Sequence, residues 1–144
     1  MIGMGTLQPV VALAAWTMVM WLWMYITRIP AIGKSGIDTK NWVGSTGKSL
    51  DDVLPDKIQW KAHNYNHLME QPTLFYAVAL VLAIAGAGDG MNAKIAWAYV
   101  ILRIVHSLIQ ATWNKITVRF SVYMLSNVPL LMLITHAALT VFKH

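Results

Sequence analysis

Four polar side chains recur along one hydrophobic segment of the chain: Arg103, His106, Gln110 and Asn114. The segment, residues 93–117, is otherwise rich in Ile, Leu, Val, Ala and Trp. At about 100° per residue, the four side chains fall within about 80° of one another on a helix, so they form one stripe. Ionisable residues in a membrane helix normally face a bundle interior or a wet cavity. We therefore predict a polar site along this stripe.

A second group of polar side chains lies at the start of the preceding apolar stretch: His63, Asn66, His67 and Glu70. These four also share one helix face, within an arc of about 100°. Glu70 enters an apolar region, and an unpaired buried carboxylate costs free energy, so it should have a partner. We expect that partner to be Arg103 or Arg119. Such a pair could fix the register of two helices without doing any chemistry.

The spacing of His63, His67 and Glu70 would also suit a metal ion bound to one helix face. A second set of ligands would then be needed, and His106 is the only other histidine expected well inside the bundle. We therefore favour hydrogen bonding and helix capping by these histidines over a metal site.

The composition places these groups in a membrane. The 144 residues are 57% hydrophobic and 12% charged, with a mean hydropathy of +0.52, whereas a soluble domain is about 25% charged. The sequence contains four apolar stretches, each with the roughly 20 residues needed to cross a hydrocarbon core. We predict an all-α integral membrane four-helix bundle, one domain over 1–144, with helices at about 7–29, 58–87, 93–117 and 119–142 and a polar loop at about 30–57. Pro72 should interrupt the second helix.

The basic residues predict the orientation. Most flank the first or third connection: Arg28, Lys34, Lys40, Lys48, Lys57, Lys61, Lys115 and Arg119. By the positive-inside rule, these two connections are cytoplasmic and both termini are outside. Nothing in the sequence supplies the solvated basic face with interleaved aromatics that a nucleic-acid partner requires. There is no cysteine, so sulfur chemistry would need a thiol brought by a cofactor.

Three motifs carry a resemblance to a known family: residues 66–76 (NHLMEQPTLFY), residues 103–107 (RIVHS) and the pair Arg119-Phe120. They resemble the MAPEG family, the membrane-associated proteins in eicosanoid and glutathione metabolism, and most closely its bacterial branch. The motifs cover about residues 60–126, and hydropathy alone carries the likeness elsewhere. The resemblance implies a homotrimer in a bacterial inner membrane, with glutathione bound between subunits near the cytoplasmic surface.

The resemblance also implies roles for individual residues. Arg119 matches the arginine that supports the glutathione thiolate, which is the nucleophile and which a nearby guanidinium favours. The further candidates for binding glutathione are Asn66, Glu70, Arg103, His106, Gln110, His63 and Lys61. A lipophilic electrophile would arrive laterally from the bilayer.

The chain departs from the family pattern at three points. Gln110 stands where the glutathione enzymes usually carry a tyrosine, and Lys61 stands where they carry an arginine. The spacing from Asn66 to Glu70 is one residue longer, which rotates the two side chains by about 100° relative to each other. An amide can still hydrogen-bond a peptide ligand, and a lysine keeps the positive charge without the bidentate fork.

Two classes of function follow. The first is a glutathione-dependent integral membrane transferase or peroxidase that acts on a lipophilic electrophile or a lipid hydroperoxide, with membrane lipids and a hydrophobic small molecule as partners. The second is a non-catalytic relative, either a lipid- or quinone-binding module or an accessory subunit of a larger membrane complex. In the second class, the polar stripe would be structural.

Overall fold

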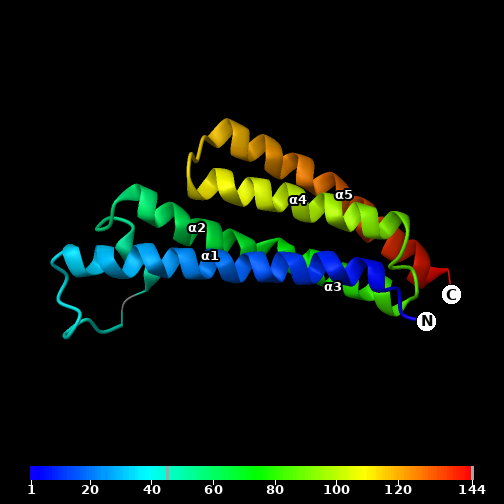
Figure 1. Ribbon diagram of the computed structural model, residues 1–144, viewed down its shortest axis with the longest axis horizontal. Helices are drawn as coiled ribbons and strands as arrows, with labels where there is room; N and C mark the ends of the chain where they lie inside the picture. Colours follow the sequence, from blue (N-terminus) through cyan, green and yellow to red (C-terminus); the bar gives the residue numbers. More distant parts are fainter. Residues whose placement is uncertain (45, 144) are drawn as a thin grey trace.

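The computed structural model describes residues 1–44 and 46–143, and every regular element within them is helical. In chain order the elements are η1 (Met4–Thr6), α1 (Leu7–Lys34), η2 (Gly47–Leu50), α2 (Asp56–Glu70), α3 (Pro72–Ile84), α4 (Met91–Ala111) and α5 (Ile116–Phe142). Because α3 continues the direction of α2, the chain forms four antiparallel rods (Figure 1). The two termini lie at one end, and the α1–α2 connection lies at the other. The predicted all-α bundle is confirmed.

Three stretches are long and apolar enough to cross a membrane: Met4–Lys34, Asp56–Ile84 and Ile116–Phe142. The expected fourth span, α4, is not among them, although its 21 residues would extend about 31 Å. Its polar stripe is turned into the bundle, where Arg103, His106 and Gln110 are buried. The protein is thus a membrane protein in which the polar stripe of α4 faces the other helices.

Large side chains fill the centre between the rods. Leu13, Phe75, Tyr99 and Leu133 are 0% exposed, and the rings of Phe75 and Tyr99 stack with centroids 4.6 Å apart. Lipid tails are as apolar as these side chains, so close packing rather than release of water holds membrane helices together. The outer faces of α1 and α5 keep large apolar residues exposed, as helices in contact with lipid do.

The second rod is broken where the sequence predicts. Gln71 separates α2 from α3, and Pro72 is the first residue of α3. Proline has no amide hydrogen to donate, so it cannot continue the hydrogen-bond ladder of a helix. The Thr73 hydroxyl donates instead to the carbonyl of Glu70, at 2.6 Å.

The third rod ends earlier than the expected 117. The helix α4 stops at Ala111, and Asn114 adopts the left-handed backbone conformation with φ of 51°. Asparagine tolerates this conformation better than most residues. The backbone amide of Asn114 donates to the backbone carbonyl of Ile109 at 2.6 Å, and this bond ends the helix. Asn114 therefore leaves the helical stripe to which we had assigned it.

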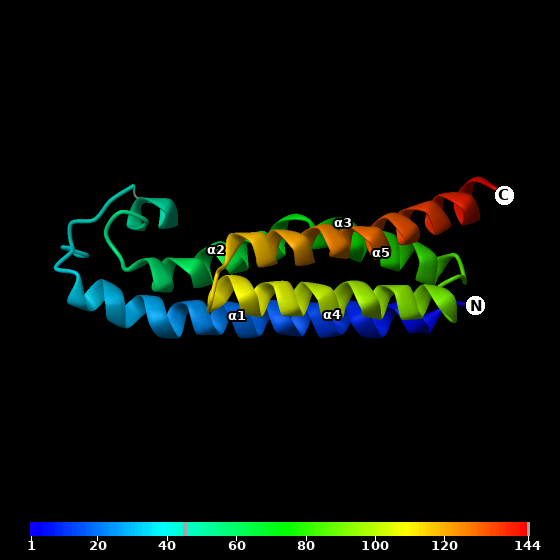
Figure 2. The same cartoon turned by 90° about the horizontal axis from the view of Figure 1, so that it is seen from above.

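The first rod runs past the expected 29 to Lys34, with Pro30 inside the helix. Together, α1 and the start of α2 project beyond the α4–α5 connection (Figures 1 and 2). A hydrogen bond of 3.3 Å from Lys61 Nζ to the carbonyl of Ala111 marks the level at which α4 ends. Beyond that level, α1 and α2 have only the α1–α2 connection beside them.

The opposite end is closed by the first residues of the chain. Gly5 donates its amide to Asp89 Oδ1 at 2.7 Å, and the Thr6 hydroxyl donates to the carbonyl of Ala79 at 3.0 Å. A Cβ atom added at Gly5 would lie only 2.8 Å from the Cβ of Ala93, so glycine permits this close approach.

Candidate functional site

A cavity of about 570 Å³ lies where α1, α2 and η2 meet. The helix α1 contributes Met24, Tyr25 and Arg28, and α2 contributes His63, Tyr65, Asn66 and Glu70. Gly47, Lys48 and Asp51 close it from the α1–α2 connection. The cavity therefore begins at the α1–α2 connection and continues along α2 to Glu70, past the level at which α4 ends.

A hydrogen-bonded chain of side chains fixes the connection against the helices. Arg28 Nη2 donates to Gln59 Oε1 at 3.0 Å, and Gln59 Nε2 donates to Asp51 Oδ1 at 2.5 Å. His63 Nε2 lies 3.0 Å from the same Asp51 oxygen. Gln59 is 2% exposed, so its two bonds join α1 to the connection through a buried amide. This network holds Arg28 at the cavity wall.

The cavity wall carries both signs of charge. Arg28 and Lys48 are cationic, and Asp51 and Glu70 are anionic. Glu70 is exposed and forms no ion pair within residues 1–44 and 46–143. Among the described residues of one chain, the expected ion pair of Glu70 with Arg103 or Arg119 does not form, although Glu70 lies near enough to Arg103 for a Coulombic interaction. A carboxylate that forms no salt bridge within the described residues is available to a ligand.

The polar stripe of α4 lies in the core and not at this cavity. Arg103 is 0% exposed and donates from Nη2 to His67 Nδ1 at 2.6 Å. The His67 ring lies 4.8 Å from that of His106, and the Arg103 guanidinium lies 5.6 Å from the centre of the Tyr123 ring. The core partner of Arg103 on α2 is thus a histidine, and the cluster is held by contacts within the chain.

Gln71, at the break between α2 and α3, connects this cluster to α5. Its amide donates to Tyr123 Oη at 3.3 Å and also to Asn127 Oδ1. Tyr99 Oη donates to Gln71 Oε1 at 3.4 Å. One amide therefore joins three helices, and the position of the break is fixed by hydrogen bonds as well as by Pro72.

Several buried polar atoms next to this cluster have no hydrogen-bond partner among the described residues: both side-chain polar atoms of Asn64, Ser107 Oγ, Gln110 Oε1, and Nε and Nη1 of Arg103. Asn64 and Ser107 lie at one level, between the contact of Lys61 with Ala111 and that of His67 with Arg103. Buried polar atoms in proteins are normally paired. Partners for these atoms therefore have to come from water or from another chain.

The remaining candidates lie away from the cavity. Arg119 Nη1 donates to Asn114 Oδ1 at 2.5 Å, at the start of α5. Lys61 donates to backbone carbonyls of α2 and α4, and its Nζ lies 5.0 Å from the centre of the Trp23 ring. Within one chain, Lys61 thus links α2 to α4, and Arg119 is hydrogen-bonded to the α4–α5 connection.

The structure therefore divides the predicted site. It brings His63, Asn66 and Glu70 to the cavity, and it places Arg103, His106 and Gln110 in the core. The cavity cations that sequence reasoning missed are Arg28 and Lys48, which we had used only to orient the protein. Lysine and arginine near the end of a membrane helix commonly reach for the interface, so the sequence gives no signal that separates Arg28 from an ordinary interfacial cation.

A helical bundle with three apolar spans and a charged cavity near one end belongs to the class of multi-pass membrane proteins. The sequence model of the MAPEG family matches residues 6–139. The chain therefore belongs to the MAPEG family, whose functions concern glutathione and eicosanoids at membranes. No curated protein and no solved structure matches the chain.

Proposed function

We propose that this protein is a glutathione-dependent membrane transferase or peroxidase that acts on a lipophilic electrophile or a lipid hydroperoxide. One observation carries the proposal: the cavity between α1 and α2 combines two cations, an amide side chain and the Glu70 carboxylate, which forms no salt bridge among the described residues. Family membership supports a role connected with glutathione or eicosanoids in general. The charges of the cavity favour glutathione.

Glutathione has two carboxylates, one ammonium group and two amides, and the cavity offers a group for each kind. Arg28 suits a carboxylate through its two-pronged guanidinium, and Lys48 supplies a second positive charge. Glu70 would accept from the ammonium group, and Asn66 would hydrogen-bond a peptide group. The volume of about 570 Å³ lies within the range of about 300–1,000 Å³ that is usual for ligand sites.

Arg119 remains our candidate for stabilising the thiolate. It does not line the cavity of its own chain, so in our proposal the implied homotrimer brings Arg119 of the partner subunit to the thiol. A guanidinium at that point lowers the pKa of the thiol and raises the fraction of nucleophilic thiolate at neutral pH. The exposed apolar faces of the bundle would let the second substrate approach from the bilayer.

Both reactions balance with these reactants. In conjugation, the thiol loses its proton to solvent, and its sulfur forms a bond to the electrophilic carbon while the leaving group departs. In the peroxidase reaction, two glutathione thiols are oxidised to one disulfide, and the hydroperoxide is reduced to an alcohol and water.

The test is a titration of glutathione into the protein in nanodiscs, followed by calorimetry and by the ultraviolet absorbance of the thiolate. We expect saturable binding with thiolate formation, loss of affinity in Arg28→Gln and loss of the thiolate band in Arg119→Ala. Lys40→Gln, an exposed residue outside the cavity, is the matched control and should bind normally. Absence of binding at millimolar glutathione would overturn the proposal in favour of the non-catalytic alternative, the lipid- or quinone-binding module or accessory subunit.

A further inference from the structure

Gln59 lies between two groups of opposite charge that line the same cavity. Arg28 Nη2 donates to its Oε1 at 3.0 Å, and its Nε2 donates to Asp51 Oδ1 at 2.5 Å. Arg28 and Asp51 form no salt bridge with each other within residues 1–44 and 46–143. The two charges are thus held apart by the width of one amide group.

An amide side chain is suited to this position because it ends in both a donor and an acceptor. A carboxylate at position 59 would have no donor for Asp51, and an ammonium would have no acceptor for Arg28. Gln59 is 2% exposed, and it is not among the residues that line the cavity. Its effect on a ligand must therefore pass through the two charged residues that it contacts.

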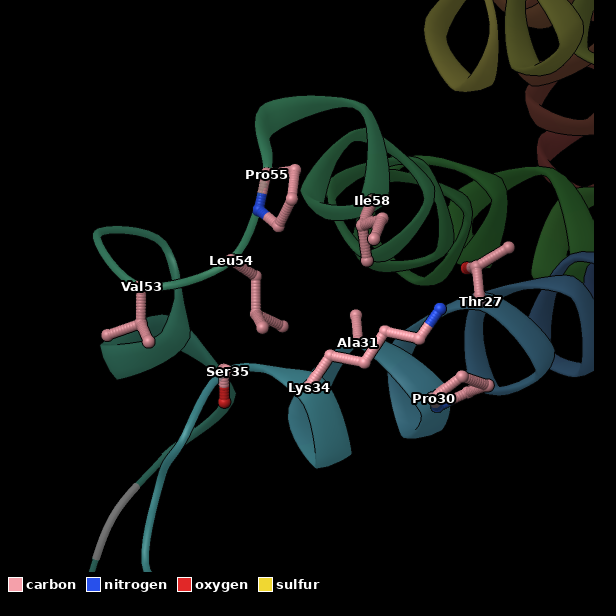
Figure 3. Close-up of a pocket in the computed structure, with 9 residues that line it drawn as sticks. All are labelled: Thr27, Pro30, Ala31, Lys34, Ser35, Val53, Leu54, Pro55 and Ile58. Atoms are coloured by element: carbon pink, nitrogen blue, oxygen red, sulfur yellow. The ribbon is translucent and has the colours of Figure 1, made fainter.

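The α1–α2 connection has anchors of its own and does not depend on Gln59 alone. Leu50 and Leu54, on either side of Asp51, are 3% and 4% exposed. In Figure 3, Leu54 and Ile58 point into the same space beside Ala31 of α1. Burial of these apolar side chains favours the observed position of the connection. Loss of the Gln59 amide should therefore leave Asp51 close to Arg28.

Without the amide between them, Arg28 and Asp51 would attract each other directly. A guanidinium and a carboxylate form a strong, often bidentate pair when they meet, and the long side chain of arginine can cross the width of an amide. Such a pair would occupy the edge of the guanidinium that a carboxylate of a ligand needs.

We propose that Gln59 is a positioning residue that keeps the Arg28 guanidinium from pairing with Asp51 and so leaves it available to a carboxylate of the ligand. The effect on affinity rests on the proposed glutathione function, whereas the separation of the two charges does not.

The test is a rescue experiment on the full-length protein in nanodiscs, with glutathione affinity measured by calorimetry. Gln59→Ala should weaken binding about tenfold, although Arg28 and Asp51 are both still present. Adding Asp51→Asn removes the competing charge and should bring the affinity within about threefold of that of Asp51→Asn alone. Adding Asp52→Asn instead makes the same change of charge at an exposed residue outside the cavity lining, and it should not restore binding.

A second substitution, Gln59→Glu, keeps the shape of the side chain and tests the proposal even if Gln59→Ala does not fold. It places a carboxylate directly on Arg28, so glutathione binding should weaken at least about tenfold. Asp51→Asn should not restore the affinity of this variant, because the competing carboxylate is then at position 59.

A measurement without ligand separates this inference from the glutathione function. Phenylglyoxal modifies guanidinium groups, and peptide mass spectrometry gives the rate of modification of Arg28. We expect a lower rate in Gln59→Ala than in the native protein, and recovery of the rate when Asp51→Asn is added. These rates in a protein that does not bind glutathione would reject the glutathione function and keep the role of Gln59.

Three results would overturn the inference. Native affinity in both Gln59 variants would remove any role of this residue in binding. A loss in Gln59→Ala that Asp51→Asn does not reverse would make Gln59 a structural residue. Equal recovery with Asp51→Asn and Asp52→Asn would indicate a general effect of negative charge on the connection.

Discussion

Two faces of α2 carry polar residues, and their surroundings differ. His63 and Glu70 are exposed and line an open cavity, whereas His67 lies against Arg103 and His106 in the core. Asn66 and His67 are neighbours in sequence, yet about 100° of rotation sends one to the cavity and the other to the core. Polar residues within one turn of a membrane helix can therefore either line a ligand cavity or pack in the core, and their angular position around the helix axis decides which.

Substitutions on the two faces of α2 should have different effects. On the core face, loss of one partner leaves other buried polar groups unpaired, which costs free energy of unfolding. On the cavity face, the groups are already in contact with water, so their loss changes ligand affinity and leaves stability near its native value. Measuring stability and glutathione affinity on the same variants tests this division.

The largest effect is expected for Arg103→Ala. The change removes the largest fully buried side chain among residues 1–44 and 46–143, together with its hydrogen bond to His67. We expect the free energy of unfolding, measured by denaturant titration in mixed micelles, to fall by about 3 kcal/mol or more. Arg103→Met keeps much of the volume and should lose less. Unchanged stability with complete loss of glutathione binding would indicate that Arg103 binds the ligand.

Arg28→Gln should have the largest effect on affinity. It removes a guanidinium that lines the cavity and is held there by Gln59. A charge-assisted hydrogen bond is worth about 2 kcal/mol, so calorimetry should show glutathione binding weakened about thirtyfold. Arg28→Lys keeps the charge without the bidentate fork, so its affinity for glutathione should lie between those of the native protein and Arg28→Gln. Native affinity in both variants would exclude Arg28 from the binding site.

Glu70 offers a paired comparison of charge and shape. Glu70→Gln should weaken glutathione binding about tenfold, since the ammonium group loses an ionised acceptor, and Glu70→Leu should weaken it further. Both variants should keep the native unfolding free energy within about 0.5 kcal/mol, because Glu70 is exposed. If both variants instead fall apart as assemblies, Glu70 holds subunits together and does not bind ligand.

The smallest effects are expected for two asparagines. Asn127→Ala removes an acceptor of Gln71 and should lower the unfolding free energy by about 1 kcal/mol without changing glutathione affinity. Asn66→Ala, on the cavity face, should show the reverse, with affinity reduced a few-fold and stability kept. The same response in both variants would contradict the division between the two faces of α2.

The sequence predicted the features that depend on one helix at a time. Hydropathy predicted the four rods, Pro72 predicted the break in the second, and the period of α4 predicted that Arg103, His106 and Gln110 share a buried face. It did not predict how each helix is rotated relative to its neighbours. The partner of Arg103 and the position of Arg28 depend on that rotation, which is a property of packing. The end of α4 was missed because it depends on the left-handed backbone of Asn114.

The closed end of the bundle has a consequence for the order of assembly. The amide of Gly5 is bound by Asp89, a residue 84 positions further along the chain. Synthesis proceeds from the N-terminus, so α1 exists long before the turn that fixes its first residues. The residues just before α1 are therefore fixed only after the turn between α3 and α4 has formed.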